Sequence, residues 1–294
     1  MPFKDFVELI VLGAIWGASF MLMRIAAPEF GIFAMVEIRA LLAALILLPF
    51  VVWRKQTSEM FVQWLHVIVV GLLNTAIPFC FFAYGSLHLP SALTALLNGT
   101  AGIFGALLAW LWLRETISHA AKIGFACGIV GVYLLSYESL SLEGVTLMPV
   151  IACLIATFCY GVAICYFKKY LTGTKPLAIA AGSQVVSAVV LLPLVVIYPV
   201  TVMPSLEAWG AVLFLAVVCT GIAYMMYFNL IGKIGASKAI YVGYIVPVFG
   251  LIWGWWLLDE PISHLMLSGA VIILLGVMLT SGGLDRAWQW LRAK

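Results

Sequence analysis

Ten apolar stretches, each about 20 residues long, follow one another along the chain with short connections between them. They cover residues 6–26, 31–52, 64–84, 90–112, 119–137, 145–167, 176–198, 207–231, 236–257 and 264–281. A helix of this length spans the hydrocarbon core of a bilayer, and the period-two alternation of a membrane barrel is absent. The sequence therefore predicts an all-α integral membrane protein with ten transmembrane helices. Only 9% of its residues are charged, whereas about 25% is usual for soluble domains.

The basic residues gather on one side of these predicted helices. If the N-terminus is cytoplasmic, the cytoplasmic segments hold thirteen of the fifteen: Lys4, Arg54, Lys55, Arg114, Lys122, Lys168, Lys169, Lys175, Lys233, Lys238, Arg286, Arg292 and Lys294. The outer loops carry acids instead: Glu29, Glu138, Glu143, Glu207, Asp259 and Glu260. Because cytoplasmic loops are enriched in Lys and Arg, both termini are predicted to be cytoplasmic. The basic loops need no nucleic-acid partner to explain them.

One phrase occurs twice, as LWLRETISH at 111–119 and as WLLDEPISH at 256–264, 145 residues later. Further matches at the same spacing or one residue less predict two repeats of five helices, over residues 1–140 and 141–294. Since five is odd, the second repeat crosses the membrane in the opposite sense. Inverted repeats are typical of secondary transporters with alternating access. No phosphate-binding loop accompanies them, so transport is expected to depend on gradients.

Glu115 and Glu260 occupy equivalent places in this phrase and are predicted at helix ends in opposite leaflets. Each is expected to hydrogen-bond the short turn that follows, where Ser118 and Ser263 are suited to cap the next helix. The alternative is a gate contact, one on each side of the membrane.

The chain resembles the EamA-type family of the drug/metabolite transporter superfamily. The resemblance rests on AIWGASFMLMRIA in the first stretch, IRALLAALILLPF in the second, LRETIS after the fourth and VPVFGLIWGWWLLDEPIS in the ninth. It implies a ten-helix carrier of the bacterial inner membrane, with a cavity among helices 1, 3, 4, 6, 8 and 9. Members export amino acids and related metabolites, or carry purines, quaternary amines or toxic cations. Two departures are Gly102, where the family often has proline, and Glu37 before Arg39.

Three charges fall inside the first two predicted helices: Arg24, Glu37 and Arg39. A charge at that depth is costly unless it is paired or hydrated, so each is a candidate for function. One interpretation is a structural ion pair between Arg24 and Glu37. The other makes Glu37 a proton-coupling acid or Arg39 an anchor for a substrate carboxylate.

Aromatic and polar side chains recur on single faces of the predicted helices. Aromatic rings suit an apolar body or a cation, and hydroxyls and amides suit a polar head group. The candidates for the cavity are Trp16, Ser19, Asn74, Phe79, Asn98, Tyr160, Tyr224, Tyr227, Tyr241 and Tyr244. For each of them, ordinary helix packing is the alternative.

Small residues and one proline mark the fourth and ninth stretches at related positions: Gly102, Gly105, Pro247 and Gly250. Small residues let membrane helices approach closely, and proline removes a backbone hydrogen bond. These positions are candidate hinges or gates, with static packing as the alternative.

The sequence thus predicts a secondary transporter that exports small amphiphilic metabolites, above all neutral or aromatic amino acids. The alternatives are efflux of organic cations or drugs, or transport of a purine or quaternary amine. No enzymatic activity is expected, because the predicted helices lack paired catalytic groups at one depth. Neither a cofactor nor a metal is expected, and the six cysteines lack the spacing of metal ligands. The expected partners are the lipid bilayer and a small-molecule substrate, protons are the candidate coupling ion, and the oligomeric state is open.

Overall fold

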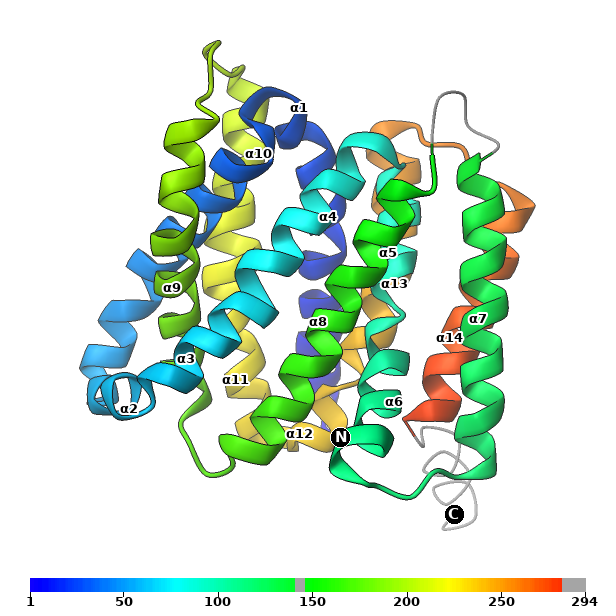
Figure 1. The fold of residues 1–294 in the computed structure, drawn as a ribbon, viewed down its shortest axis with the longest axis horizontal. Coiled ribbons are helices and arrows are strands. Elements are labelled where there is room, and N and C mark those ends of the chain that lie inside the picture. Colours follow the sequence, from blue (N-terminus) through cyan, green and yellow to red (C-terminus); the bar gives the residue numbers. More distant parts are fainter. Residues whose placement is uncertain (141–145, 282–294) are drawn as a thin grey trace.

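The computed structural model describes residues 1–140 and 146–281, and these form a bundle of helices (Figure 1). The helices are α1 (Phe3–Trp53), α2 (Thr57–Val62), α3 (Trp64–Gly71), η1 (Leu72–Ala76), α4 (Ile77–His88), α5 (Ser91–Asn98), α6 (Ala101–Leu113), α7 (His119–Leu140), α8 (Met148–Tyr170), α9 (Pro176–Ile197), α10 (Leu206–Ala216), η2 (Val217–Ile222), α11 (Ala223–Ile234), α12 (Ala236–Ala239), α13 (Val242–Leu258) and α14 (His264–Thr280). The predicted Glu143, Arg286, Arg292 and Lys294 lie outside the described residues.

Helix α1 contains two membrane spans rather than one. Its 51 residues are interrupted at Gly31, whose φ of 72° and ψ of 172° are non-helical. Glycine adopts positive φ without the steric cost of a Cβ, and Pro28 just before it lacks a donor for the helix ladder. The described chain has seven helical units long and apolar enough to cross a membrane, α1 among them, and two shorter apolar helices, α13 and α14. With α1 counted as two spans, this confirms the ten predicted transmembrane helices.

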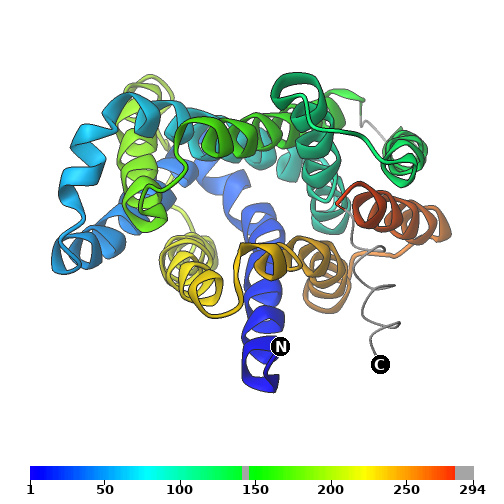
Figure 2. The same cartoon turned by 90° about the horizontal axis from the view of Figure 1, so that it is seen from below.

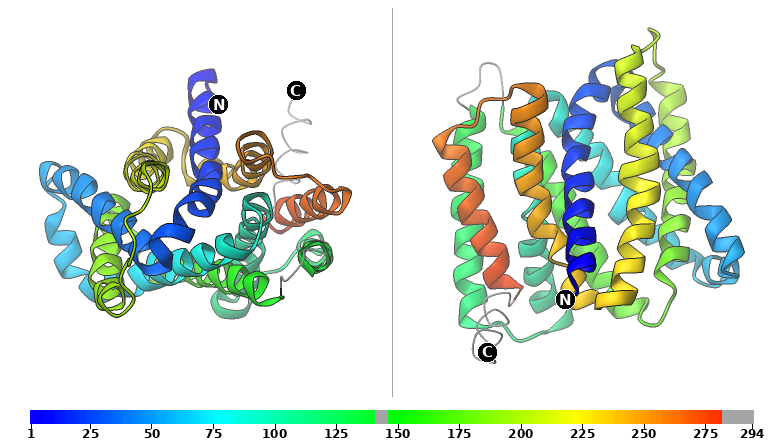
Figure 3. Two further views of the ribbon diagram at one scale, coloured as in Figure 1. Left: turned by 90° about the horizontal axis from the view of Figure 1, so that it is seen from above. Right: turned by 180° about the vertical axis from the view of Figure 1, so that it is seen from behind.

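The two halves of the chain run in opposite senses. The N-terminus lies at the lower end of Figure 1, where α1 begins its ascent, and α7, the last span of the first half, ends at the upper end. The second half starts there with α8 running downward, and α14 also descends. The first part of α1 lies between α11 and α13 (Figure 3), whereas α7 and α14 pack together at one edge (Figure 2). The fold is therefore the predicted inverted repeat.

The described part of each half contains one widened π-helical segment, and the two occur at the same place in the repeat. Segment η1 begins at Leu72 and η2 begins at Val217, which is 145 residues later. A π-segment shifts the register of the side chains that follow it and is frequent at functional sites. No feature of the apolar periodicity predicted these segments.

The repeated phrase forms the same turn in both halves. Arg114 and Asp259 take the left-handed conformation, with φ of 57° and 51°. The following amides of Glu115 and Glu260 then donate to carbonyls six residues back, at 3.2 and 3.1 Å. This wide, left-handed turn satisfies a carbonyl left over at the end of each helix. Ser118 accepts from Ala121 N at 3.1 Å and Ser263 accepts from Met266 N at 3.0 Å, so both serines cap the next helix.

Two predicted helices are less regular than expected. The fourth is divided at Gly99 and Thr100, whose amides donate to carbonyls three residues back. The ninth is not one helix from residue 236, because α12 ends at Ala239 and α13 starts at Val242. Three-residue bonds tighten the backbone locally and turn the next helix in a new direction. Both divisions lie at the inner wall of the bundle.

Candidate functional site

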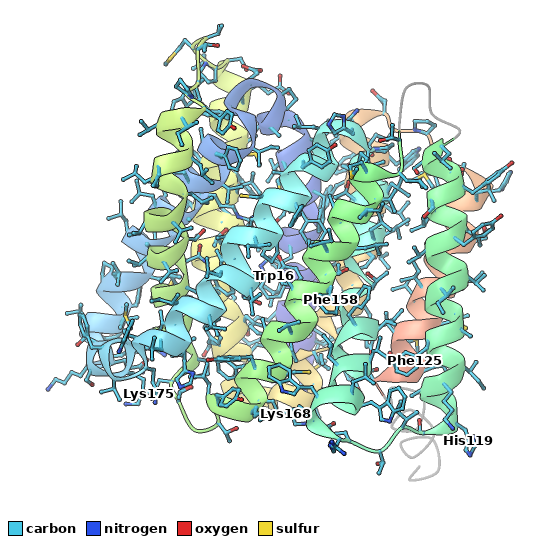
Figure 4. All side chains as sticks on the ribbon, viewed as in Figure 1. Trp16, His119, Phe125, Phe158, Lys168 and Lys175 are labelled. Carbon is cyan, nitrogen blue, oxygen red and sulfur yellow. The ribbon has the colours of Figure 1, made fainter. Side chains whose placement is uncertain are left out.

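A cavity of about 340 Å³ lies within the bundle. Trp16, one of its walls, is seen halfway between the two ends of the molecule in Figure 4. Its lining is Trp16, Ser19, Phe20, Met23, Arg39, Asn74, Phe79, Phe82, Asn98, Ala101, Tyr160, Ile164, Cys219, Thr220, Tyr224, Tyr227, Val242, Gly243 and Val246. These residues come from α1, η1, α4, α5, α6, α8, η2, α11 and α13. The family resemblance implied a cavity among helices 1, 3, 4, 6, 8 and 9. In the structure the second span also contributes to the lining, through Arg39.

Eight of the ten cavity candidates lie on this lining: Trp16, Ser19, Asn74, Phe79, Asn98, Tyr160, Tyr224 and Tyr227. The other two, Tyr241 and Tyr244, lie outside it. Their rings pack on each other with centroids 5.9 Å apart, and the Tyr244 hydroxyl hydrogen-bonds Ser281 Oγ. The late start of α13 explains the difference, because its cavity face is formed by Val242, Gly243 and Val246.

Aromatic rings form two walls of the cavity. Trp16 is held by a hydrogen bond from Nε1 to Cys219 O at 3.1 Å and packs against Tyr227 at 5.2 Å and Tyr224 at 6.3 Å. On another side, Phe82 lies 5.9 Å from Tyr160. Rings in these tilted and edge arrangements are rigid and offer flat apolar faces to a ligand.

Arg39 is the charged side chain of the lining and is only 5% exposed. Its Nε donates to Thr220 Oγ1 at 2.9 Å, and its guanidinium carbon lies 3.8 Å from the centre of the Phe79 ring. Thr220 belongs to η2 and donates in turn to Leu215 O at 2.8 Å. The π-segment thus orients the threonine that holds Arg39. Within the described residues no carboxylate forms an ion pair with this guanidinium, because the ion pairs there are Lys168–Glu115 and Lys233–Glu8.

The predicted pairing of Arg24 with Glu37 is wrong. The Arg24 Nη1 atom donates to the carbonyls of Ser86, Leu87 and Leu89, at 3.1, 3.3 and 3.0 Å. These carbonyls end α4, where a helix leaves unpaired acceptors and favours a cation. Neither Arg24 nor Glu37 lines the cavity. Glu37 is 8% exposed, and its Oε2 has no hydrogen-bond partner among the described residues.

The candidate hinge residues lie at close helix contacts. A Cβ on Gly250 would collide with the Cβ of Ala95, and one on Gly102 would lie 2.8 Å from a methyl group of Val277. Pro247 lies across from Gly99, at the division between α5 and α6. Gly105 also approaches a neighbouring helix closely, because a Cβ on Gly161 would lie 3.0 Å from the Gly105 amide nitrogen. In this structure these residues allow neighbouring helices to pack closely.

The two repeated glutamates have different partners. Glu260 accepts from Ser91 N at 2.8 Å, Ser91 Oγ at 2.9 Å and Ala92 N at 3.1 Å, and so holds the start of α5. Glu115 instead forms an ion pair with Lys168 at the exposed lower end of the bundle (Figure 4). The carboxylates are therefore unequal although their backbones are alike.

The position equivalent to Arg39 in the second repeat is Ser183, 144 residues later. Ser183 Oγ accepts from Thr75 Oγ1 at 3.3 Å, and Thr75 is the equivalent of Thr220. The contact between these two helices is thus kept in both halves, but only the first half supplies a charge.

Sequence reasoning missed several apolar members of the lining, among them Phe20, Ile164 and Val246. Phe20 follows Trp16 by four residues, so helical spacing was a sufficient signal for it. Ile164 follows the predicted Tyr160 by the same four residues and could have been found in the same way. Val246 carried no such signal, since an aliphatic residue in an apolar helix resembles its lipid-facing neighbours.

The chain is similar over almost its whole length to curated transporters. It is 24% identical to the "Probable amino-acid metabolite efflux pump" of Escherichia coli (strain K12), over 100% of this chain and 98% of that protein. It is 25% identical to the "Uncharacterized transporter YoaV" of Bacillus subtilis (strain 168), over 95% and 97%. It is 26% identical to the "Uncharacterized inner membrane transporter YedA" of Escherichia coli (strain K12), over 94% and 90%.

A protein crystal structure shares the fold, with a TM-score of 0.66 over 98% of this chain and 99% of that chain, at 16% identity. The model of the EamA-like transporter family matches the sequence twice, at residues 7–137 and 147–282. The chain is a multi-pass membrane transporter, and it belongs to the EamA-like transporter family.

Proposed function

We propose that this transporter exports small amphiphilic metabolites, with neutral and aromatic amino acids as its substrates. The observation that carries the proposal is Arg39, a buried cation on the cavity wall without a carboxylate partner among the described residues. A guanidinium binds a carboxylate with two parallel hydrogen bonds, and the aromatic walls suit an apolar side chain. The Escherichia coli relative named as a probable amino-acid metabolite efflux pump also supports this choice.

The proposed mechanism is alternating access. The two repeats, residues 1–140 and 141–294, rock against each other about the cavity, which opens to one side and then to the other. Gly102, Gly105, Pro247 and Gly250 are the proposed moving contacts, because small residues at close approaches let helices slide and bend.

We also propose the bacterial inner membrane, with both termini in the cytoplasm. Lys168 and Lys175 lie at the same end of the bundle as the N-terminus (Figures 1 and 4), as expected if that end is cytoplasmic. Coupling to protons through Glu37 is the proposed energy source, because this acid is buried and its Oε2 has no hydrogen-bond partner in the part of the chain that the structure describes. Uncoupled diffusion down the gradient is the alternative.

Efflux of organic cations is less well supported by the cavity. A cation would need an acid on the lining, and Glu37, the acid predicted at depth, is not there. Arg39 would instead repel a positively charged substrate.

Counterflow into liposomes tests the proposal. Purified transporter is reconstituted with unlabelled phenylalanine or leucine inside, and uptake of the labelled amino acid is followed. Uptake above that of empty liposomes is expected, with at least about tenfold loss in Arg39→Gln because the carboxylate loses its partner. Lys122→Gln, on the exposed surface of α7, is the matched control and should keep full uptake. Absence of counterflow for aromatic and branched amino acids alike would refute the proposal.

A further inference from the structure

We infer that the cavity prefers a monocarboxylate with an aromatic or branched apolar body over the zwitterionic amino acid of the same shape. An organic cation of that shape should bind least. This inference rests on the proposed function and concerns the charge state of the substrate that the same site selects.

The charges of the lining carry the argument. Among the described residues of the lining, Arg39 is the one that is formally charged at neutral pH, and the other polar groups are the amides of Asn74 and Asn98, hydroxyls, a thiol and the indole N–H of Trp16. The described ion pairs, Lys168–Glu115 and Lys233–Glu8, involve none of the lining residues. The described lining therefore carries one positive charge, on a side chain that is only 5% exposed.

A buried charge is costly until an opposite charge neutralises it, and the energy of each added charge depends on that balance. A monocarboxylate brings the site to neutrality. A zwitterion leaves the net positive charge unchanged, and its ammonium group, two bonds from the carboxylate carbon, is held close to the guanidinium. A cation raises the net charge to two. The expected order of affinity is therefore anion, zwitterion, cation.

The way Arg39 is held favours a carboxylate as the bound group. Thr220 Oγ1 accepts a hydrogen bond from Nε, and the Phe79 ring covers one face of the guanidinium plane. Within residues 1–140 and 146–281, the hydrogen-bond partner of Nη1 is a weak one, Met23 Sδ at 3.9 Å. Because two sides are fixed by the protein, the terminal nitrogens are pre-oriented for an incoming anion.

The neutral lining offers an ammonium group little in return. Amide oxygens and ring faces can accept it, but these contacts are weaker than an ion pair in the same environment. Trp16 already packs edge to face against Tyr224 and in a tilted arrangement against Tyr227. Their faces are better suited to an apolar ring than to a desolvated charge.

A series of ligands that differ only in charge tests the inference. The compounds are 3-phenylpropanoate, phenylalanine and phenethylamine, which share a ring and chain and have charges of minus one, zero and plus one. Binding to the purified full-length transporter is measured by calorimetry, because the protonated acid crosses bilayers unaided and would obscure uptake. The propanoate should bind about tenfold more tightly than phenylalanine, with phenethylamine weaker still. The series of 4-methylpentanoate, leucine and isoamylamine repeats the comparison for a branched body.

Two variants assign the preference to Arg39. Arg39→Gln should remove the advantage of the anion over the zwitterion. Arg39→Lys should weaken binding but keep the order of affinity, since lysine keeps the positive charge and loses the paired N–H donors of the guanidinium. If Arg39→Gln fails to fold, Arg39→Lys still reports on the order. Phenylalanine binding as tightly as 3-phenylpropanoate would overturn the inference and leave the proposed function intact. Failure of all three compounds to bind would overturn both.

Discussion

Replacing Glu260 by glutamine should destabilise the transporter far more than the equivalent change at Glu115. Glu260 is half-buried, and its carboxylate accepts three hydrogen bonds from Ser91 and Ala92 at the start of α5. Glutamine keeps one acceptor oxygen and turns an NH₂ group toward backbone donors. It also removes a negative charge from the positive end of a helix.

The size of the effect follows from these contacts. A hydrogen bond to a charged group contributes roughly 1.5–3 kcal/mol, and loss of about two of the three with partial rehydration costs about 2–4 kcal/mol. Glu115 and its partner Lys168 have side chains 43% and 61% exposed. An ion pair so open to solvent contributes about 0–1 kcal/mol.

Thermal unfolding in detergent measures the difference. One kcal/mol corresponds to about 2 °C or slightly more in a chain of this size, so Glu260→Gln should lower Tm by about 4–10 °C and Glu115→Gln by no more than about 2 °C. Ser91→Ala, which removes only the hydroxyl donor, should give an intermediate value. Equal losses in the two glutamine variants would refute the reasoning, because the repeated backbone turn would then account for the stability without the side-chain contacts.

Three further substitutions test other parts of the structure. Glu37→Gln should abolish uptake driven by a pH gradient and leave counterflow intact, because only the coupled process needs a titrating acid; equal loss of both would argue for a structural role. Gly250→Ala should lower Tm and slow counterflow, since its Cβ meets Ala95, whereas Gly210→Ala, which meets nothing, should be neutral or stabilising; matching melting curves would contradict this. Asp259→Gly should raise Tm by about 1–3 °C, because glycine relieves the left-handed strain, and an unchanged or lower Tm would show that no strain is stored there.

The ten spans and their inverted order could be predicted from the sequence because apolar length and the repeated phrase depend on residues close together in the chain. The ends agree within a few residues for most helices: the fourth span, for example, was expected at 90–112 and runs from Ser91 to Leu113. The π-segments escaped prediction because their wider turn changes the backbone without any marker residue. Their equal position in both repeats became visible only in three dimensions.

The site was harder to predict because it depends on contacts between distant helices. Helical spacing placed Trp16 and Tyr224 on cavity-facing stripes, and both line the cavity. The same reasoning failed for Tyr241 and Tyr244, whose helix begins later than its apolar pattern suggests. One interpretation of the sequence paired Arg24 with Glu37 because both are charged, whereas in the structure Arg24 donates to backbone carbonyls. A sequence shows charges but not the free carbonyls at the end of a neighbouring helix.

Arg39 in one repeat and Ser183 at the equivalent place in the other make the two halves of the transporter chemically unequal. One half supplies a positive charge, and the other supplies a neutral hydroxyl. If the halves were identical, exchanging their shapes would present the same cavity to either side of the membrane. If Arg39 binds the carboxylate of the substrate as proposed, the carboxylate stays with that half throughout the cycle, so the molecule crosses without turning over and the end that enters first also leaves first. The half-saturation concentrations on the two faces should then differ, although the final distribution of substrate is still set by the gradients alone.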